Sequence, residues 1–135
     1  MSDKRSPADN IVQGATNRAA LDLCIEPIRL AARSHGYAVA LHGSVARDID
    51  LIAIPWIENA SQPDQLVDAV IGAIAGSLGQ CFDRTHSKPK RREGRRQWTE
   101  KPHGRRVAML HAWVGETSIH FDFGVMPLIP KKVAE

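Results

Sequence analysis

Two aspartates on an apolar strand are the feature that most constrains how this chain can fold. Asp48 and Asp50 flank Ile49 at the start of an apolar run that ends at Pro55. Such a run has the composition of a buried β-strand, and the proline stops it. Because residues i and i+2 of a strand point to the same face, the two carboxylates project side by side. Like charges held this close need a cation, a shared proton or a basic partner, and a divalent metal is the simplest of these.

The strand that holds Asp50 is expected to belong to a hairpin. Residues 37–42 have the composition of a short strand, residues 43–47 that of a turn, and residues 49–54 that of the second strand. The sequence therefore predicts an antiparallel pair, with the Gly-Ser turn at its tip.

A second hairpin is predicted near the end of the chain, around a two-residue turn whose Gly-first order suits type II′. Its register places the apolar side chains on one face and Asp122, His111 and His120 on the other. A carboxylate between two phenylalanines is out of place on a purely structural strand. The two strands are expected at 107–114 and 118–126.

Two segments have the apolar periodicity of helices. The first covers about residues 11–34, where Pro27 is expected to split or kink it, and the second begins with Ser61 as N-cap and ends at Gly79. Together these elements predict a small α/β (α+β) fold, a single domain over residues 1–135. Its mixed, largely antiparallel sheet of four or five strands has helices on one face and the carboxylates on the other.

Positive charge is concentrated in one segment. Residues 84–106 hold ten Lys or Arg and two Glu, a net charge of +8, so the rest of the chain carries −5 of the total of +3. Prolines and glycines interrupt this segment, which predicts a mobile basic loop. The loop is either a solvated connector or an arm that attracts a triphosphate or a nucleic-acid backbone, with Trp98 as a stacking candidate.

Cysteine usage and hydropathy point to the cytoplasm. Cys24 and Cys81 are expected to be reduced rather than disulfide-bonded. The N-terminal residues lack the apolar core of a signal peptide, and no window has the length and hydropathy of a membrane span. We therefore expect a cytoplasmic protein without a membrane contact.

The Gly43-Ser44 pair, the strand with Asp48 and Asp50, and Asp122 on a later strand resemble the nucleotidyltransferase superfamily. That superfamily includes DNA polymerase beta, the kanamycin-type antibiotic nucleotidyltransferases and the minimal nucleotidyltransferases. The resemblance covers the catalytic core rather than the whole chain, and it would make this protein a shortened and divergent member.

The resemblance implies roles for particular residues. Asp48, Asp50 and Asp122 would be the catalytic carboxylates and hold one or two Mg²⁺ ions, and Asp122 would also be a possible general base. Two metals about 4 Å apart can clamp the attacking and leaving oxygens of a phosphoryl transfer.

Gly43 and Ser44 would contact the triphosphate, because a small turn residue lets backbone amides approach phosphates. Arg47 would stabilise charge, and His120 would line the pocket beside the third carboxylate. Only three residues separate the Gly-Ser pair from Asp48, where the family places about a dozen, so a tight turn must keep Ser44 within reach of the site.

These residues predict a metal-dependent nucleotidyltransferase that moves a nucleoside monophosphate from a nucleoside triphosphate to a hydroxyl of a protein, nucleic acid or small molecule. The alternative is a catalytically inactive module of the same fold that binds nucleic acid through its basic loop, Arg84–Arg106. A third possibility is a small interaction protein whose basic loop docks on an acidic partner.

Overall fold

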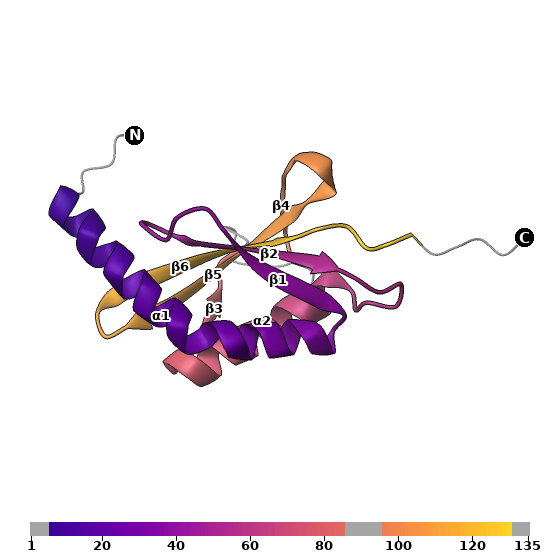
Figure 1. Cartoon of the computed structure of the whole chain (residues 1–135), viewed down its shortest axis with the longest axis horizontal. Helices are drawn as coiled ribbons and strands as arrows, with labels where there is room; N and C mark the ends of the chain where they lie inside the picture. Colours follow the sequence, from indigo (N-terminus) through magenta and orange to yellow (C-terminus); the bar gives the residue numbers. More distant parts are fainter. Residues whose placement is uncertain (1–5, 86–95, 131–135) are drawn as a thin grey trace, which may run out of the picture.

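A six-stranded sheet with two helices on one side forms the described part of the chain (Figure 1). The computed structural model describes residues 6–85 and 96–130. The elements are α1 (Pro7–Ser34), β1 (Tyr37–His42), β2 (Ile49–Pro55), α2 (Pro63–Leu78), β3 (Phe82–Asp83), β4 (Thr99–Glu100), β5 (Arg106–Val114) and β6 (Thr117–Val125), with a 3₁₀ turn at Pro102–Gly104. This mixed α+β architecture confirms the predicted fold class.

The strand order β1-β2-β6-β5-β3 joins two hairpins through one parallel pair. Strands β1 and β2 pair antiparallel, as do β5 and β6, whereas β2 and β6 run parallel. The register of the second hairpin is the predicted one, with His111 opposite His120. The parallel pairing places Asp50 directly opposite Asp122. The topology therefore brings together two carboxylates that lie 72 positions apart in the sequence.

The two faces of the sheet differ as expected. The side chains of Leu51, Leu110 and Phe121 are buried against the helices. The alternate positions, among them Asp50 and Asp122, are half-buried on the opposite face. In Figure 1 α2 and the later part of α1 lie below the strands, and the first turns of α1 rise at the left. The placement of helices on one face and carboxylates on the other is confirmed.

Helix α1 is longer than predicted and is not split. Ser6 caps it, with the backbone N–H of Asp9 donating to the Ser6 hydroxyl and the Asp9 carboxylate accepting from the Ser6 backbone N–H. Pro27 lies inside a continuous helix, so the expected split is wrong, whereas the ribbon does bend along its length in Figure 1. The carbonyl of Leu23, four residues before the proline, loses its partner. Leu23 is 62% exposed, so water can solvate its carbonyl group.

Helix α2 begins after Gln62, one residue beyond the predicted N-cap. The Gln65 side chain accepts a hydrogen bond from the Gln62 backbone N–H at 3.2 Å. Ser61 is used differently, because its hydroxyl contacts His35 and its carbonyl accepts from the Tyr37 hydroxyl. Gly79 ends the helix with φ 98°, as expected for a glycine at this position.

Part of the basic segment is regular structure rather than loop. Residues 99–100 form β4, and β5 begins at Arg106, which pairs with Glu100. The expected loop over 84–106 therefore does not extend through its second half, because strand pairing with β5 satisfies the backbone there. The predictions for residues 86–95 lie outside the described residues.

Candidate functional site

The centre of the candidate site is the pair Asp50 and Asp122, which project from neighbouring parallel strands. Burial, followed by the negative charges of Asp48 and Asp50 and a hydrogen bond with Asp50, raises the pKa of Asp122 to about 6, while Lys101 opposes the shift. When the Asp122 carboxyl group is protonated, it can donate that hydrogen bond to Asp50. Below about pH 6 the pair can therefore share one proton, whereas at neutral pH its negative charges repel each other.

Two basic side chains share a pocket with the carboxylates. The pocket has a volume of about 240 Å³, and its lining includes His42, Lys101 and Arg105 beside Asp50 and Asp122. His42 lies opposite Asp50 on β1. The pocket therefore combines acidic oxygens with basic groups that could neutralise a bound phosphate.

The strand connection between β4 and β5 supplies both of these cations. The Lys101 backbone N–H donates to the carbonyl of Arg105 at 2.8 Å, which closes the connection. The Arg105 side chain lies across Gly124, and a Cβ at position 124 would come within 2.9 Å of the Nη1 atom of Arg105. Glycine at position 124 of β6 therefore leaves room for the guanidinium above the sheet.

The two residues of the predicted Gly-Ser turn, Gly43 and Ser44, have different surroundings. Gly43 has φ +72°, and a Cβ there would lie 3.7 Å from the Oδ2 atom of Asp50, so this residue borders the pair. Ser44 is exposed and lines recesses that face α1 instead. Arg47 is exposed. The lining of the acidic pocket includes neither Ser44 nor Arg47. The structure thus brings Asp50, Asp122 and Gly43 together, whereas Ser44 and Arg47 lie in the exposed turn outside the lining of this pocket.

The turn is anchored to the first helix by a buried amide. Asn17 is fully buried, and its Nδ2 atom donates to the carbonyl of Val45 at 2.7 Å. Val45 is itself buried. This contact fixes the segment just before Asp48, which is half-buried and contributes its charge to the pair.

His120 lies on the same open face, on the other side of Asp122 from Arg105. A second pocket of about 340 Å³ is lined by Arg84, Met109, His111, His120 and Asp122, among others. The Ser118 hydroxyl contacts both imidazoles, at 3.1 Å from His120. Burial lowers the pKa of His111, and the nearby charges of His120 and Arg84 lower it further.

The fit of a magnesium ion depends on the donor set. Within 6–85 and 96–130, no three His, Cys, Asp or Glu side chains form a preassembled metal cage. Mg²⁺ is usually bound through one or two carboxylates together with water and substrate phosphates, rather than by a cage made only of protein ligands. Asp50 and Asp122, with Asp48 beside them, provide hard oxygen ligands of that kind. The residue types present are therefore compatible with a magnesium ion that is bound together with phosphates.

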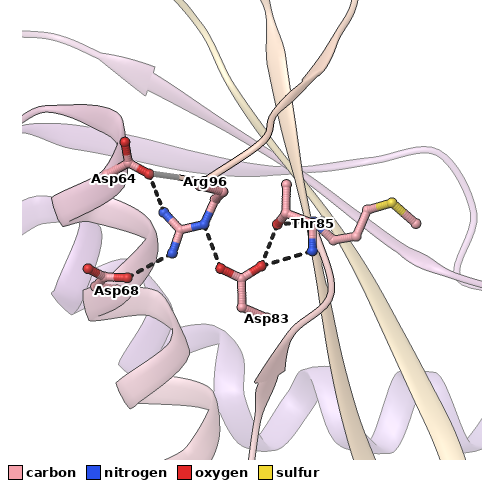
Figure 2. Close-up of polar contacts among 6 residues, drawn as sticks. Asp64, Asp68, Asp83, Thr85 and Arg96 are labelled. Carbon is pink, nitrogen blue, oxygen red and sulfur yellow. Dashed lines mark hydrogen bonds and ion pairs between the residues drawn. The ribbon is translucent and has the colours of Figure 1, made fainter. Parts of the chain in front are cut away.

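A buried arginine that the sequence did not single out holds the base of the basic segment (Figure 2). The side chain of Arg96 is 1% exposed and contacts Asp64 at 2.6 Å, Asp68 at 2.8 Å and Asp83 at 2.6 Å. Thr85 donates to Asp83 through both its hydroxyl and its backbone N–H. Burial tends to raise the pKa of Asp83, but these bonds and Arg96 outweigh it and lower that pKa. Arg96 therefore acts as a structural clasp and is not part of a phosphate-binding arm.

Trp98, the expected stacking residue, is partly buried against the core. Arg106 lies 5.1 Å and Arg96 5.6 Å from its ring centroid. These cation–π contacts and the core packing occupy the ring within the protein.

Sequence reasoning missed Lys101, Arg105 and His42 as neighbours of the carboxylates. The two cations were visible only as members of a basic run, and nothing in the run distinguished them. His42 carried a usable signal, because the predicted hairpin could have been extended to pair it with Asp50.

The sequence matches no protein-family model, and no curated protein aligns with it significantly. Among the helices of the described ranges, none is both long enough and apolar enough to cross a membrane.

Proposed function

We propose that this protein is a metal-dependent nucleotidyltransferase that moves a nucleoside monophosphate from a nucleoside triphosphate to a hydroxyl acceptor. One observation carries the proposal, which is the direct pairing of Asp50 and Asp122 across parallel strands on the open face of the sheet. A half-buried carboxylate pair is costly to hold without a cation, and such a pair suits magnesium bound together with phosphates. Asp48 lies outside the lining of the pocket but is near enough for its charge to raise the pKa of Asp122, so it could add a third carboxylate to a bound metal.

The residues of the pocket have distinct roles in this reaction. Asp48, Asp50 and Asp122 would hold the metal, which when bound supplies Lewis-acid stabilisation of the phosphate charge. Lys101 and Arg105 would contact the triphosphate and stabilise the charge of the leaving pyrophosphate. Gly43 leaves space for a phosphate to approach Asp50, while Ser44 and Arg47 would contact the triphosphate only from the rim of the turn.

The transfer itself conserves atoms and charge. The acceptor hydroxyl oxygen forms a bond to the α-phosphorus, and the bond from that phosphorus to the bridging oxygen of the pyrophosphate breaks. The hydroxyl proton would pass to Asp122, the carboxylate of the pair on β6, as the general base. Pyrophosphate leaves as the second product.

We place this activity in the cytoplasm. Both cysteines are free thiols, and burial raises the pKa of Cys24 to about 11 and that of Cys81 to about 12. Such thiols are poorly reactive, which is compatible with a reducing compartment.

A labelling experiment tests the proposal. The protein is incubated with Mg²⁺, RNA and protein acceptors, and each of the four nucleoside triphosphates labelled in turn at the α- or γ-phosphate. The proposal predicts that α-label is transferred and unlabelled pyrophosphate is released, and that Asp122→Asn abolishes both. Transfer of γ-label would identify a kinase instead, and transfer that survives Asp122→Asn would remove the carboxylate pair from the reaction.

A further inference from the structure

The open face of the sheet carries a continuous array of rings beside the acidic pocket. Phe82 and Trp113 meet edge to face at 5.8 Å between ring centroids, Trp113 stacks on His111 at 4.3 Å, and His111 lies 4.0 Å from His120. These four rings come from β3, β5 and β6 and share the face opposite the helices. The array leads along the sheet to Asp122, two residues beyond His120.

The array is held rigidly from its edge. The Gln80 side chain donates to the carbonyl of Trp113 at 2.7 Å and accepts from its backbone N–H at 3.0 Å. This amide therefore pairs with β5 as another strand residue would, and it fixes the backbone that carries the indole ring. The Ser118 hydroxyl forms hydrogen bonds with the imidazole rings of both His111 and His120. A ring surface fixed in advance loses little conformational entropy when a ligand stacks on it.

Cross-strand ring pairs also stabilise sheets without any ligand, but this array remains open to solvent. Phe82 is 50% exposed and Met109, which lies between the array and the acidic pair, is 43% exposed. Both described helices cover the other face of the sheet. The inner rings stack on one another, so the ring surfaces open to a ligand lie at the two ends of the array, at Phe82 and at the exposed His120. Exposed rings with cations beside them suit planar, anionic ligands.

The cations lie on both sides of Asp122. Arg84 lines the 340 Å³ pocket with His111 and His120, whereas Lys101 and Arg105 line the acidic pocket beyond it. A strand of nucleic acid that crosses the face would meet rings for its bases and basic side chains for its phosphates. Aromatic stacking combined with backbone-tracking charge is the general mode of single-strand binding.

We propose that Phe82, Trp113, His111 and His120 form a stacking site for unpaired bases of a single-stranded nucleic acid. The four rings themselves lie outside the basic segment 84–106, which supplies the neighbouring cation Arg84, and they do not line the proposed triphosphate pocket. Binding at the ring array is independent of the proposed transfer.

Two labelled decamers of equal charge test the site, one of thymidylate and one of abasic residues. Affinities are measured by fluorescence anisotropy at about 150 mM salt with EDTA present and no triphosphate. Since each stacked base contributes about 1–3 kcal/mol, the full chain should bind the thymidylate decamer at least ~5-fold more tightly than the abasic one. Trp113→Leu should bring this ratio close to one, and Phe82→Leu, at the exposed margin of the array, should lower it severalfold.

Trp56→Leu is the matched control, because Trp56 is 59% exposed and lies beyond the far end of β2. This substitution should leave the ratio unchanged. Equal affinity of the wild-type chain for the two decamers would overturn the stacking site and leave only charge contacts. An equal loss with Trp56→Leu and Trp113→Leu would overturn it as well. The binding assay contains EDTA and no triphosphate, so its outcome does not depend on whether the protein catalyses the proposed transfer.

Discussion

Replacement of Asp122 by asparagine should stabilise the free protein at neutral pH. Burial and the charges of Asp48 and Asp50 raise the pKa of Asp122 from 3.8 to about 6. The folded state therefore binds a proton between these values that the unfolded state has released, so stability falls as pH rises from about 4 to 6. Asparagine removes the repulsion and can still donate a hydrogen bond to Asp50.

The size of the effect follows from the shift. One pKa unit corresponds to about 1.4 kcal/mol, so the full shift would be ~3 kcal/mol. Asp122 is only half-buried, and solvent screening reduces this to about 1–2 kcal/mol in the free energy of unfolding. For a chain of this size that gain corresponds to a Tm increase of roughly 3–8 °C.

Thermal unfolding of wild type and Asp122→Asn, followed by circular dichroism in EDTA at pH 4.5 and pH 7.5, measures this directly. The gain should be complete at pH 7.5 and reduced to roughly a third at pH 4.5, which lies between the unfolded and folded pKa values. Asp22→Asn, at an exposed position on α1, is the control and should change Tm little at either pH. An asparagine variant that is no more stable at pH 7.5, or equally stabilised at both values, would refute the charge repulsion at the pair.

Three other substitutions and one control variant test the packing of the fold by chemical denaturation. Arg96→Met should lower the free energy of unfolding by about 3 kcal/mol, because it leaves the half-buried Asp83 without its cation. The control Arg29→Met, at an exposed ion pair, should lower it by less than ~0.5 kcal/mol. Equal losses in the two variants would contradict a structural role for Arg96. Gly36→Ala should destabilise by more than ~1 kcal/mol, since φ is +86° and the Cβ would lie 2.9 Å from backbone. Gly72→Ala in α2, with open space around it, should instead stabilise by about 0.5–1 kcal/mol, and a loss there would contradict the packing.

Local patterns in the sequence predicted much of the fold. The two-residue turn at Gly115 fixed the register of β5 and β6, since shifting it would exchange the apolar and polar faces. Helix α2 was predicted within two residues at its start because its apolar stripe and Gly79 are strong local signals. These features depend on neighbours in the sequence.

Contacts between distant segments were harder to predict. Asp64 and Asp68 lie on one face of α2 and could have signalled a missing cation, but the basic run offers ten equivalent candidates. Only the pairing of β3 with β5 shows that Arg96 reaches Asp83. The position of Ser44 was equally hidden, because the turn is held by Asn17 on α1 rather than by its own residues.

Calorimetric titration of each of the four nucleoside triphosphates, with and without Mg²⁺, tests the central claim most directly. The wild-type chain should bind at least one triphosphate only when magnesium is present. Asp50→Asn and Asp122→Asn should lose this binding while remaining folded, and Asp22→Asn should retain it. Magnesium-independent binding, binding that survives in both pair variants, or no binding at millimolar triphosphate would contradict a metal-dependent triphosphate site at Asp50 and Asp122.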